Sequence, residues 1–137
     1  MTIPVSNSPN KGYLLDANAA IARINGEPQI TAFLRTSAAV HLSIIVVGEL
    51  FYGAEKSSRP SENRAAVDEF INGRSILICD SVTAGWYGRI HAQLRRKGRP
   101  IPQNDIWIAA TAMQHDLVLL TKDQHFQQVD GLNVESW

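Results

Sequence analysis

The sequence predicts one α/β domain in which a mainly parallel sheet of four or five strands lies between two layers of helices. Short apolar runs of the kind found in buried strands alternate along the chain with longer segments of helical periodicity. Such alternation is typical of a parallel sheet covered on both faces. The 137 residues, 45% of them hydrophobic, suffice for one domain with a substantial core. We expect a three-layer α/β/α domain over residues 12–137, preceded by a polar, flexible leader over residues 1–11.

The first half of the chain predicts two strands and four helices. Asn25 and Gly26 form a common helix stop, and Pro28 is suited to open the next helix. Ser43 is a suitable N-cap for the helix that follows the second strand. We expect strands over residues 12–15 and 40–42, and helices over residues 17–24, 28–36, 44–56 and 61–71.

The second half predicts up to three further strands and two helices. The longest helix is amphipathic, because an apolar residue recurs at every fourth position from Val82 to Leu94, and Gly98 ends it. Two prolines then interrupt the chain before the next helix begins. We expect strands over residues 75–79, 117–120 and 132–134, the last at an edge, and helices over residues 82–97 and 104–115.

Four acidic residues stand where an expected strand passes into a helix or loop, or on the helix that follows it: Asp16, Glu49, Asp105 and Asp123. The carboxyl ends of parallel strands meet at one edge of a sheet, so these side chains should converge there. Carboxylates that converge repel one another unless protons or a divalent cation neutralise them. Oxygen ligands of this kind suit Mg²⁺ or Mn²⁺. The pattern therefore predicts a metal-dependent acidic active site, for which phosphodiester hydrolysis is the natural chemistry.

Each acid also has a purely structural interpretation, and these alternatives stay open at the level of sequence. Asp16 and Asp105 are suited to stabilise a helix N-terminus, and Asp123 is suited to a turn. Glu49 shares a helix face with apolar residues, where it needs a metal, a proton or an arginine partner. Asp80 is a fifth acid after a strand, for which we favour capping of the next helix.

Several other classes of site are excluded or left aside. The only cysteine is Cys79, which rules out an internal disulfide framework and a cysteine-rich zinc site and fits a reduced, cytoplasmic setting. No apolar run approaches the roughly 20 residues that span a bilayer, so we expect no membrane association. No histidine pair has the spacing of a zinc site. His125 lies near Asp123, but we interpret it as a loop or packing residue and leave it outside the catalytic set.

The formal net charge of zero does not by itself announce a polyanionic partner, so the distribution of charge matters more than the sum. The densest basic group precedes the Asp105 segment. Its cations can contact RNA phosphates, or they can simply complement the dipole at the end of a helix. We carry both interpretations for Arg89, Arg95, Arg96, Lys97 and Arg99.

Four segments carry a resemblance that spans nearly the whole chain. They are residues 13–18 (YLLDAN), 48–57 (GELFYGAEKS), 101–112 (IPQNDIWIAATA) and 119–126 (LLTKDQHF). Taken in this order, they resemble the PIN-domain ribonucleases, and above all the VapC-type toxins of bacterial toxin–antitoxin pairs. Ala17 departs from the family pattern at a position where threonine is frequent, but it removes no acid.

The resemblance implies a function and assigns roles. Asp16, Glu49, Asp105 and Asp123 match the family's four catalytic, metal-binding acids. The chain is then expected to be a Mg²⁺- or Mn²⁺-dependent endoribonuclease, usually a homodimer, that a cognate antitoxin holds inactive. A metal-activated water is expected to attack the phosphorus of the RNA and leave a 5′-phosphate.

Two further residues and two rival functions complete the expectations. We expect Asn18 and Ser43 to orient the acids without binding the metal ion themselves. A HAD-type phosphatase needs a second aspartate where this chain has Asn18, which counts against that class. The other rival is a catalytically silent PIN-like module that binds RNA or protein, in which the acids only cap helices and pair with arginines.

Overall fold

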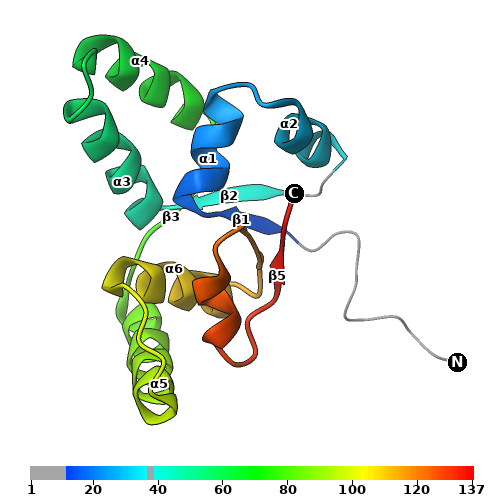
Figure 1. The fold of residues 1–137 in the computed structure, drawn as a ribbon, viewed down its shortest axis with the longest axis vertical. Coiled ribbons are helices and arrows are strands. Elements are labelled where there is room, and N and C mark those ends of the chain that lie inside the picture. The colour runs from blue at the N-terminus through cyan, green and yellow to red at the C-terminus, as the bar shows by residue number, and fades with distance from the viewer. Residues whose placement is uncertain (1–11, 37–38) are drawn as a thin grey trace, which may run out of the picture.

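The computed structural model describes residues 12–36 and 39–137, so the expected leader over residues 1–11 lies outside the described residues. The chain folds into the expected three-layer α/β/α domain (Figure 1). Its sheet has five strands in the order β3-β2-β1-β4-β5, and every neighbouring pair is parallel. The larger of the two predicted strand numbers is therefore correct.

The elements follow one another in the expected order. The strands are β1 (Tyr13–Leu15), β2 (Val40–Ser43), β3 (Ser75–Leu77), β4 (Val118–Leu120) and β5 (Val134–Glu135). The helices are α1 (Ala17–Ile24), α2 (Pro28–Arg35), α3 (Ile44–Glu55), α4 (Pro60–Ile71), α5 (Ser81–Lys97) and α6 (Gln103–Gln114). A short 3₁₀ helix, η1 (Gln124–Gln128), lies between β4 and β5.

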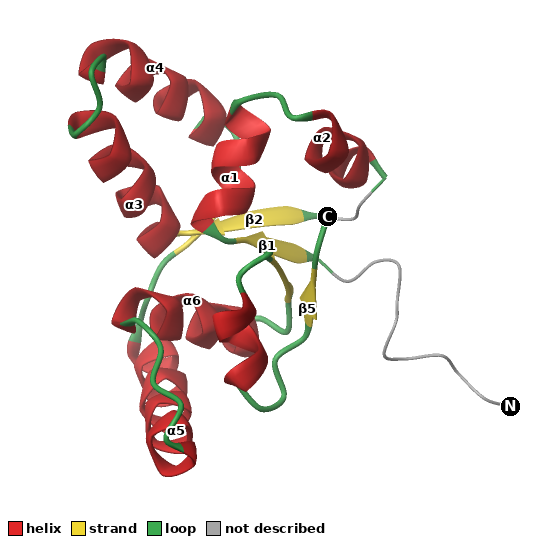
Figure 2. Ribbon diagram, in the orientation of Figure 1, coloured by secondary structure: helices red, strands yellow, loops and turns green. Residues whose placement is uncertain are grey.

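The helices divide between the two faces of the sheet. Helices α1 to α4 lie on one side of the strands, and α5 and α6 lie on the other (Figure 2). The central strands are buried on both faces, which is why they read in the sequence as continuous apolar runs rather than as an alternation. Within the described part of the chain, no helix combines the length and the apolar character needed to cross a lipid bilayer.

The register of the sheet brings the strand ends together. Leu15, the last residue of β1, pairs with Leu42 on one side and with Leu120 on the other. Directly after that pairing, the backbone N–H of Asp16 still donates to the carbonyl of Leu120, at 3.2 Å. Residues that leave β1, β2 and β4 in the carboxyl direction therefore start from neighbouring points on one edge of the sheet.

Two strands differ by more than one residue from the sequence-based expectation. β3 ends at Leu77 rather than at residue 79, because Asp80 is the N-cap of α5 and the chain must leave the sheet to reach it. β5 begins at Val134 rather than at residue 132, because Gly131 has a positive φ of 81° and the backbone is still turning there. Each shift places the strand end where the neighbouring turn allows it.

Candidate active site

Asp16 leaves the central strand β1 and begins α1. Its Oδ1 accepts a hydrogen bond from the backbone N–H of Ala19 at 2.7 Å, so it is the N-cap of that helix. Its Oδ2 accepts a hydrogen bond from the hydroxyl of Thr121, at the end of β4. The residue is only 4% exposed. Burial raises the pKa of Asp16 even though these hydrogen bonds favour its charged form.

Glu49 lies in α3, and its position depends on the start of that helix. Ser43 is fully buried, and its hydroxyl accepts a hydrogen bond from the backbone N–H of Val46 at 3.1 Å. Ser43 thus fixes the first turn of α3, and Glu49 follows in the next. Among the described residues, Oε1 of Glu49 is buried without a hydrogen-bond partner. Burial, followed by repulsion from Asp105 and Asp16, raises the pKa of Glu49.

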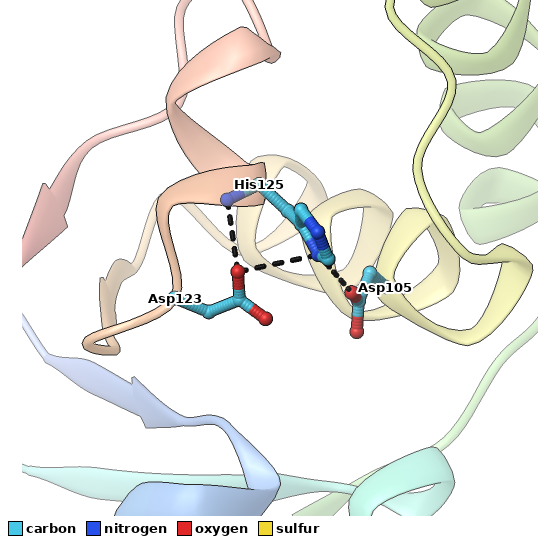
Figure 3. A group of neighbouring side chains, drawn as sticks. All are labelled: Asp105, Asp123 and His125. Atoms are coloured by element: carbon cyan, nitrogen blue, oxygen red, sulfur yellow. Dashed lines mark hydrogen bonds and ion pairs between the residues drawn. The ribbon is translucent and has the colours of Figure 1, made fainter.

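Asp105 and Asp123 come from α6 and from the loop after β4, and His125 lies between their carboxylates (Figure 3). Asp105 lies in the first turn of α6, whose N-cap position is Pro102, so its carboxylate is not used as a cap. Asp123 is the N-cap of η1 and accepts a hydrogen bond from the backbone N–H of His125 at 2.9 Å. Burial is the main cause that raises the pKa of Asp105, with a contribution from Asp123.

The four acids affect one another electrostatically, as expected from their strand-end positions. The charge of Asp123 disfavours ionisation of Asp16, and the charges of Asp16 and Asp105 disfavour ionisation of Glu49. Residues 107 positions apart in sequence, Asp16 and Asp123, are thus neighbours in space. All four carboxylates that the sequence singled out are thus electrostatically coupled.

The cluster fits a divalent cation better than it fits a purely structural role. The buried, unpartnered oxygen of Glu49 lacks the arginine that the structural interpretation requires. An orphaned carboxylate oxygen of this kind is costly unless a cation or a proton satisfies it. Oxygen donors from four side chains are the ligand set that Mg²⁺ and Mn²⁺ prefer. Among the described residues, the ligand atoms that lie within 4.8 Å of one another and could share one ion belong to Asp105, Asp123 and His125. Asp16 and Glu49 are coupled to this group electrostatically.

The structure adds two residues that the sequence analysis left out. The Nδ1 atom of His125 lies 3.2 Å from Oδ1 of Asp123 and 3.4 Å from Oδ2 of Asp105. The hydroxyl of Thr121 donates to Asp16 and accepts from the backbone N–H of Asp123 at 2.9 Å. The position of His125 two residues after Asp123 was a usable signal, whereas the contact of Thr121 with Asp16 depends on the pairing of β1 with β4.

For the two residues expected to orient the acids, the structure gives contacts with the starts of helices. The hydroxyl of Ser43 caps α3, the helix that carries Glu49. Asn18 is exposed, and its backbone N–H favours the charged form of Asp16 from the first turn of α1. Asp80, the fifth acid, is the N-cap of α5 and forms a capping box with Thr83, so the preference for a structural role at that position is confirmed.

The basic residues of α5 lie at the end of the helix that adjoins α6. Arg95 lines a hollow of about 310 Å³ together with Ile106, the residue that follows Asp105. Arg89, two turns earlier in α5, stacks over the ring of Trp86, with its guanidinium carbon 4.2 Å from the ring centroid. All five residues of this group are exposed, and Lys97 forms an ion pair with Asp130.

The comparisons agree with this geometry. The family model for the PIN domain matches residues 13–132, so the chain belongs to the PIN-domain family. Within it, the chain is similar to ribonuclease VapC2 of Haemophilus influenzae (strain ATCC 51907 / DSM 11121 / KW20 / Rd), with 36% identity over 128 residues, 91% of this chain and 97% of that protein. It is also 34% identical to the tRNA(fMet)-specific endonuclease VapC of Shigella flexneri, with the same coverage.

Solved structures show the same fold. The DNA-bound VapBC complex of Salmonella typhimurium contains a chain with a TM-score of 0.83 and 36% identity, and the match covers 93% of this chain and 98% of that one. The VapBC2 complex of Rickettsia felis, bound to a DNA fragment from its promoter, gives a TM-score of 0.86 at 28% identity, with 92% and 98% coverage. The fold of the chain thus matches that of the VapC structures along nearly its whole length.

Proposed function

We propose that the protein is a metal-dependent endoribonuclease and the toxin of a toxin–antitoxin pair. The observation that carries the proposal is the meeting of Asp16, Glu49, Asp105 and Asp123 at one sheet edge, with a buried and unpartnered oxygen on Glu49. The VapC relatives, whose names describe ribonucleases, support RNA as the substrate.

The chain's own residues then have distinct tasks. Asp16, Glu49 and Asp105 hold the ion, and Asp123 completes the cluster from the loop after β4. When bound, the divalent cation supplies a water of lowered pKa and positive charge against the scissile phosphate. Thr121 fixes the carboxylate of Asp16 and the backbone of Asp123 relative to each other. Burial of Asp16 and of Thr121 strengthens the hydrogen bond between them because it excludes bulk water there.

RNA has to reach this acidic edge although the chain has no net positive charge. The end of α5 offers a route, since Arg95 shares a hollow with the residue after Asp105. We propose that Arg89, Arg95, Arg96 and Arg99 contact the phosphates of the RNA on that side. Replacement of both Arg95 and Arg96 by glutamate is expected to weaken cleavage at least about tenfold at low salt. Unchanged cleavage and an unchanged salt dependence in this variant would assign these arginines to the helix dipole instead.

We propose that an antitoxin binds in a groove on the face of the sheet that α1 to α4 cover, opposite α5 (Figure 2). A hollow of about 250 Å³ between α1, α3 and α4 starts at Glu49 and is floored by apolar side chains such as Leu50. It shares Ile24 with a second hollow, of about 540 Å³, that contains Arg23 and Arg74. The first hollow thus has Glu49 as its charged residue, and the second has two arginines together with Glu69. A partner segment with a cation at one end, apolar residues in its middle and an acid at the other end complements the groove.

Charge reversal tests this docking mode. Arg23→Glu is expected to weaken binding of a cognate antitoxin by about tenfold, because a like charge then faces the acidic end of the segment. Arg35→Glu, which changes an exposed arginine in the last turn of α2, is the matched control. Equal affinity of both variants and the wild type would place the antitoxin elsewhere.

A homodimer in the cytoplasm is the proposed state of the free protein. Ile78 and Val82 are 65% and 56% exposed and lie close together in sequence at the start of α5. Apolar side chains of this size are usually covered when they belong to an interface. Light scattering on the purified protein should give twice the chain mass, and Val82→Asp should give the monomer. A monomeric wild type at micromolar concentration would argue against the dimer.

The function is tested by cleavage of total bacterial RNA with Mg²⁺ or Mn²⁺, beside an EDTA control and the Asp16→Asn variant. Discrete fragments that vanish in both controls are the expected result. Intact RNA with folded, antitoxin-free wild type would instead support a narrow substrate range or a silent binding module. Titration with Mn²⁺ separates those two outcomes, because only an enzyme of the proposed kind needs to bind the ion.

A further inference from the structure

His125 adds a nitrogen atom to a site otherwise made of oxygen. Its Nδ1 atom lies between the two carboxylates, 3.2 Å from Oδ1 of Asp123 and 3.4 Å from Oδ2 of Asp105 (Figure 3). One ligand atom from each of these three residues lies within 4.8 Å of the other two. A cation held by Asp105 and Asp123 would therefore have the Nδ1 atom of His125 within reach as a third ligand atom.

The backbone around His125 is fixed, so this placement is built into the fold. The next residue, Phe126, is 1% exposed and anchors η1 in the core. The backbone N–H of His125 donates to the carboxylate of Asp123, which caps the same short helix. The imidazole itself remains about half exposed, with 52% of the side chain accessible. The backbone of His125 is thus fixed, while its ring is accessible to solvent, as is suitable for a metal ligand at an open edge.

A simple ion-pair role explains less. An exposed pair between histidine and a carboxylate contributes little to stability. His125 contacts two acids at once, and both belong to the cluster that lacks positive charge. Among the described histidines, His91 forms an edge-to-face ring contact with Tyr87, and His41 is hydrogen-bonded to Ser75. Neither of these two lies among the acids.

We propose that His125 is a direct nitrogen ligand of the metal ion and that it makes the site discriminate in favour of transition-metal ions over Mg²⁺. This inference rests on the proposed function of the same site. The physical reason is that Mg²⁺ is a hard ion that prefers oxygen, whereas affinity for nitrogen rises from Mn²⁺ along the first transition series. Four carboxylates alone distinguish these ions poorly. One imidazole added to them shifts the balance toward Mn²⁺ and the ions beyond it.

The decisive readout is spectroscopic and independent of RNA cleavage. Mn²⁺ is added to the full-length, tag-free protein, and pulsed electron paramagnetic resonance detects whether a ¹⁴N nucleus is coupled to the bound ion. The wild type should show nitrogen coupling, and His125→Ala should lose it. His91→Ala, which removes an exposed imidazole from α5, is the matched control and should keep the coupling.

Binding constants provide the second measurement. Calorimetric titration with Mn²⁺ and with Mg²⁺ should show that His125→Ala weakens Mn²⁺ binding about tenfold or more, while Mg²⁺ binding changes less than about threefold. His125→Asp replaces the nitrogen by a carboxylate oxygen, so it should bind Mg²⁺ at least as well as the wild type and lose the preference for Mn²⁺. This variant keeps the test valid if the alanine variant is poorly folded.

The outcomes separate the inference from the function on which it rests. Wild type that binds Mn²⁺ without nitrogen coupling, or a ratio of the two affinities that His125→Asp leaves unchanged, overturns the role of His125 and leaves the acidic site intact. Wild type that binds neither ion overturns the metal site itself. Nitrogen coupling that survives in His125→Ala but disappears in His91→Ala also overturns the proposal.

Discussion

Asp16 and Asp80 occupy the same kind of position and have opposite electrostatic properties. Each follows a strand and is the N-cap of the next helix. Asp80 is exposed and accepts hydrogen bonds from Val82, Thr83 and Gln114, which together lower its pKa. Asp16 is buried beside other acids, and its pKa is raised. A strand-end cap therefore does not by itself identify an active site; burial among like charges does.

The largest difference between the two residues should be in catalysis. Asp16→Asn is expected to lower the rate of RNA cleavage by about 10²–10³-fold, because it removes a charged ligand while an amide oxygen still caps α1. Asp80→Asn is expected to retain cleavage within about twofold, since the substitution is conservative at a cap. The measurement is the initial rate on one RNA substrate with saturating Mn²⁺. Similar losses in the two variants would remove the distinction between cap and ligand.

The next largest effect should be on stabilisation by metal. A divalent ion at about 100 times its dissociation constant stabilises a folded protein that binds it by about 2.7 kcal/mol. We expect this gain in thermal unfolding for the wild type and for Asp80→Asn, and little of it for Asp16→Asn. EDTA should reverse it. A gain of equal size in Asp16→Asn would show that the ion binds at another place.

A substitution of Glu49 should show how much the acidic cluster lowers the free energy of unfolding when no metal is bound. Because burial and neighbouring acids raise its folded-state pKa, a proton binds Glu49 more tightly in the folded chain than in the unfolded one. Its contribution to stability is therefore present at a pH below its ordinary pKa and is lost as the pH rises through the raised value. Glu49→Gln should stabilise the metal-free protein at pH 7 by about 0.5–1 kcal/mol, with solvent screening allowed for. Chemical denaturation at pH 7 and pH 4 measures both terms, and a destabilised variant at pH 7 would contradict the prediction.

Asp80 should show the reverse pH dependence, and the smallest effect. Its pKa is lowered in the folded state, so its contribution to stability is present above its ordinary pKa and is lost as the pH falls through the lowered value. Asp80→Ala should therefore lower the unfolding temperature by a few degrees at pH 7 and by less in acid. Differential scanning fluorimetry over this pH range is sufficient. An unfolding temperature that is unaffected at every pH would mean that the capping box contributes nothing.

The sequence predicts the fold well because local signals and the global architecture agree. Each of the six expected helices forms, and its ends lie within one residue of the prediction. Pro28 at the start of α2 and Gly98 after α5 act through backbone conformations that their own chemistry favours. The strand ends that differ, in β3 and β5, depend on turns and on ladder partners distant in sequence. The backbone N–H of Leu119 donates to the carbonyl of Asn133, for example, and no local pattern fixes that pairing.

The residues of the candidate site also fall into two groups, those that local sequence signals predict and those that depend on contacts distant in sequence. Asp16 and Asp123 could be predicted because parallel strands place their carboxyl ends on one edge of the sheet. Asp105 lies in the first turn of α6, which follows α5 rather than a strand, so its position depends on how that helix packs. His125 was left out because a histidine in a loop has many structural roles, and its contact with Asp105 depends on how η1 lies against α6. The lack of a hydrogen-bond partner for Oε1 of Glu49 could not be predicted either, because it depends on the positions of all the donors around that atom.

The hydroxyl of Thr121 connects the ends of two adjacent strands, because it donates to Asp16 after β1 and accepts from the backbone of Asp123 after β4. A chain of this family that carries valine at the same position keeps every carboxylate and loses this spacer between two of them. Its sequence would still contain all four acidic residues, although the distance between the first and the last of them would no longer be fixed by a hydroxyl. Activity can therefore decay in evolution through a residue without charge. The presence of four acids in a relative then shows common ancestry but does not by itself show that the relative is active.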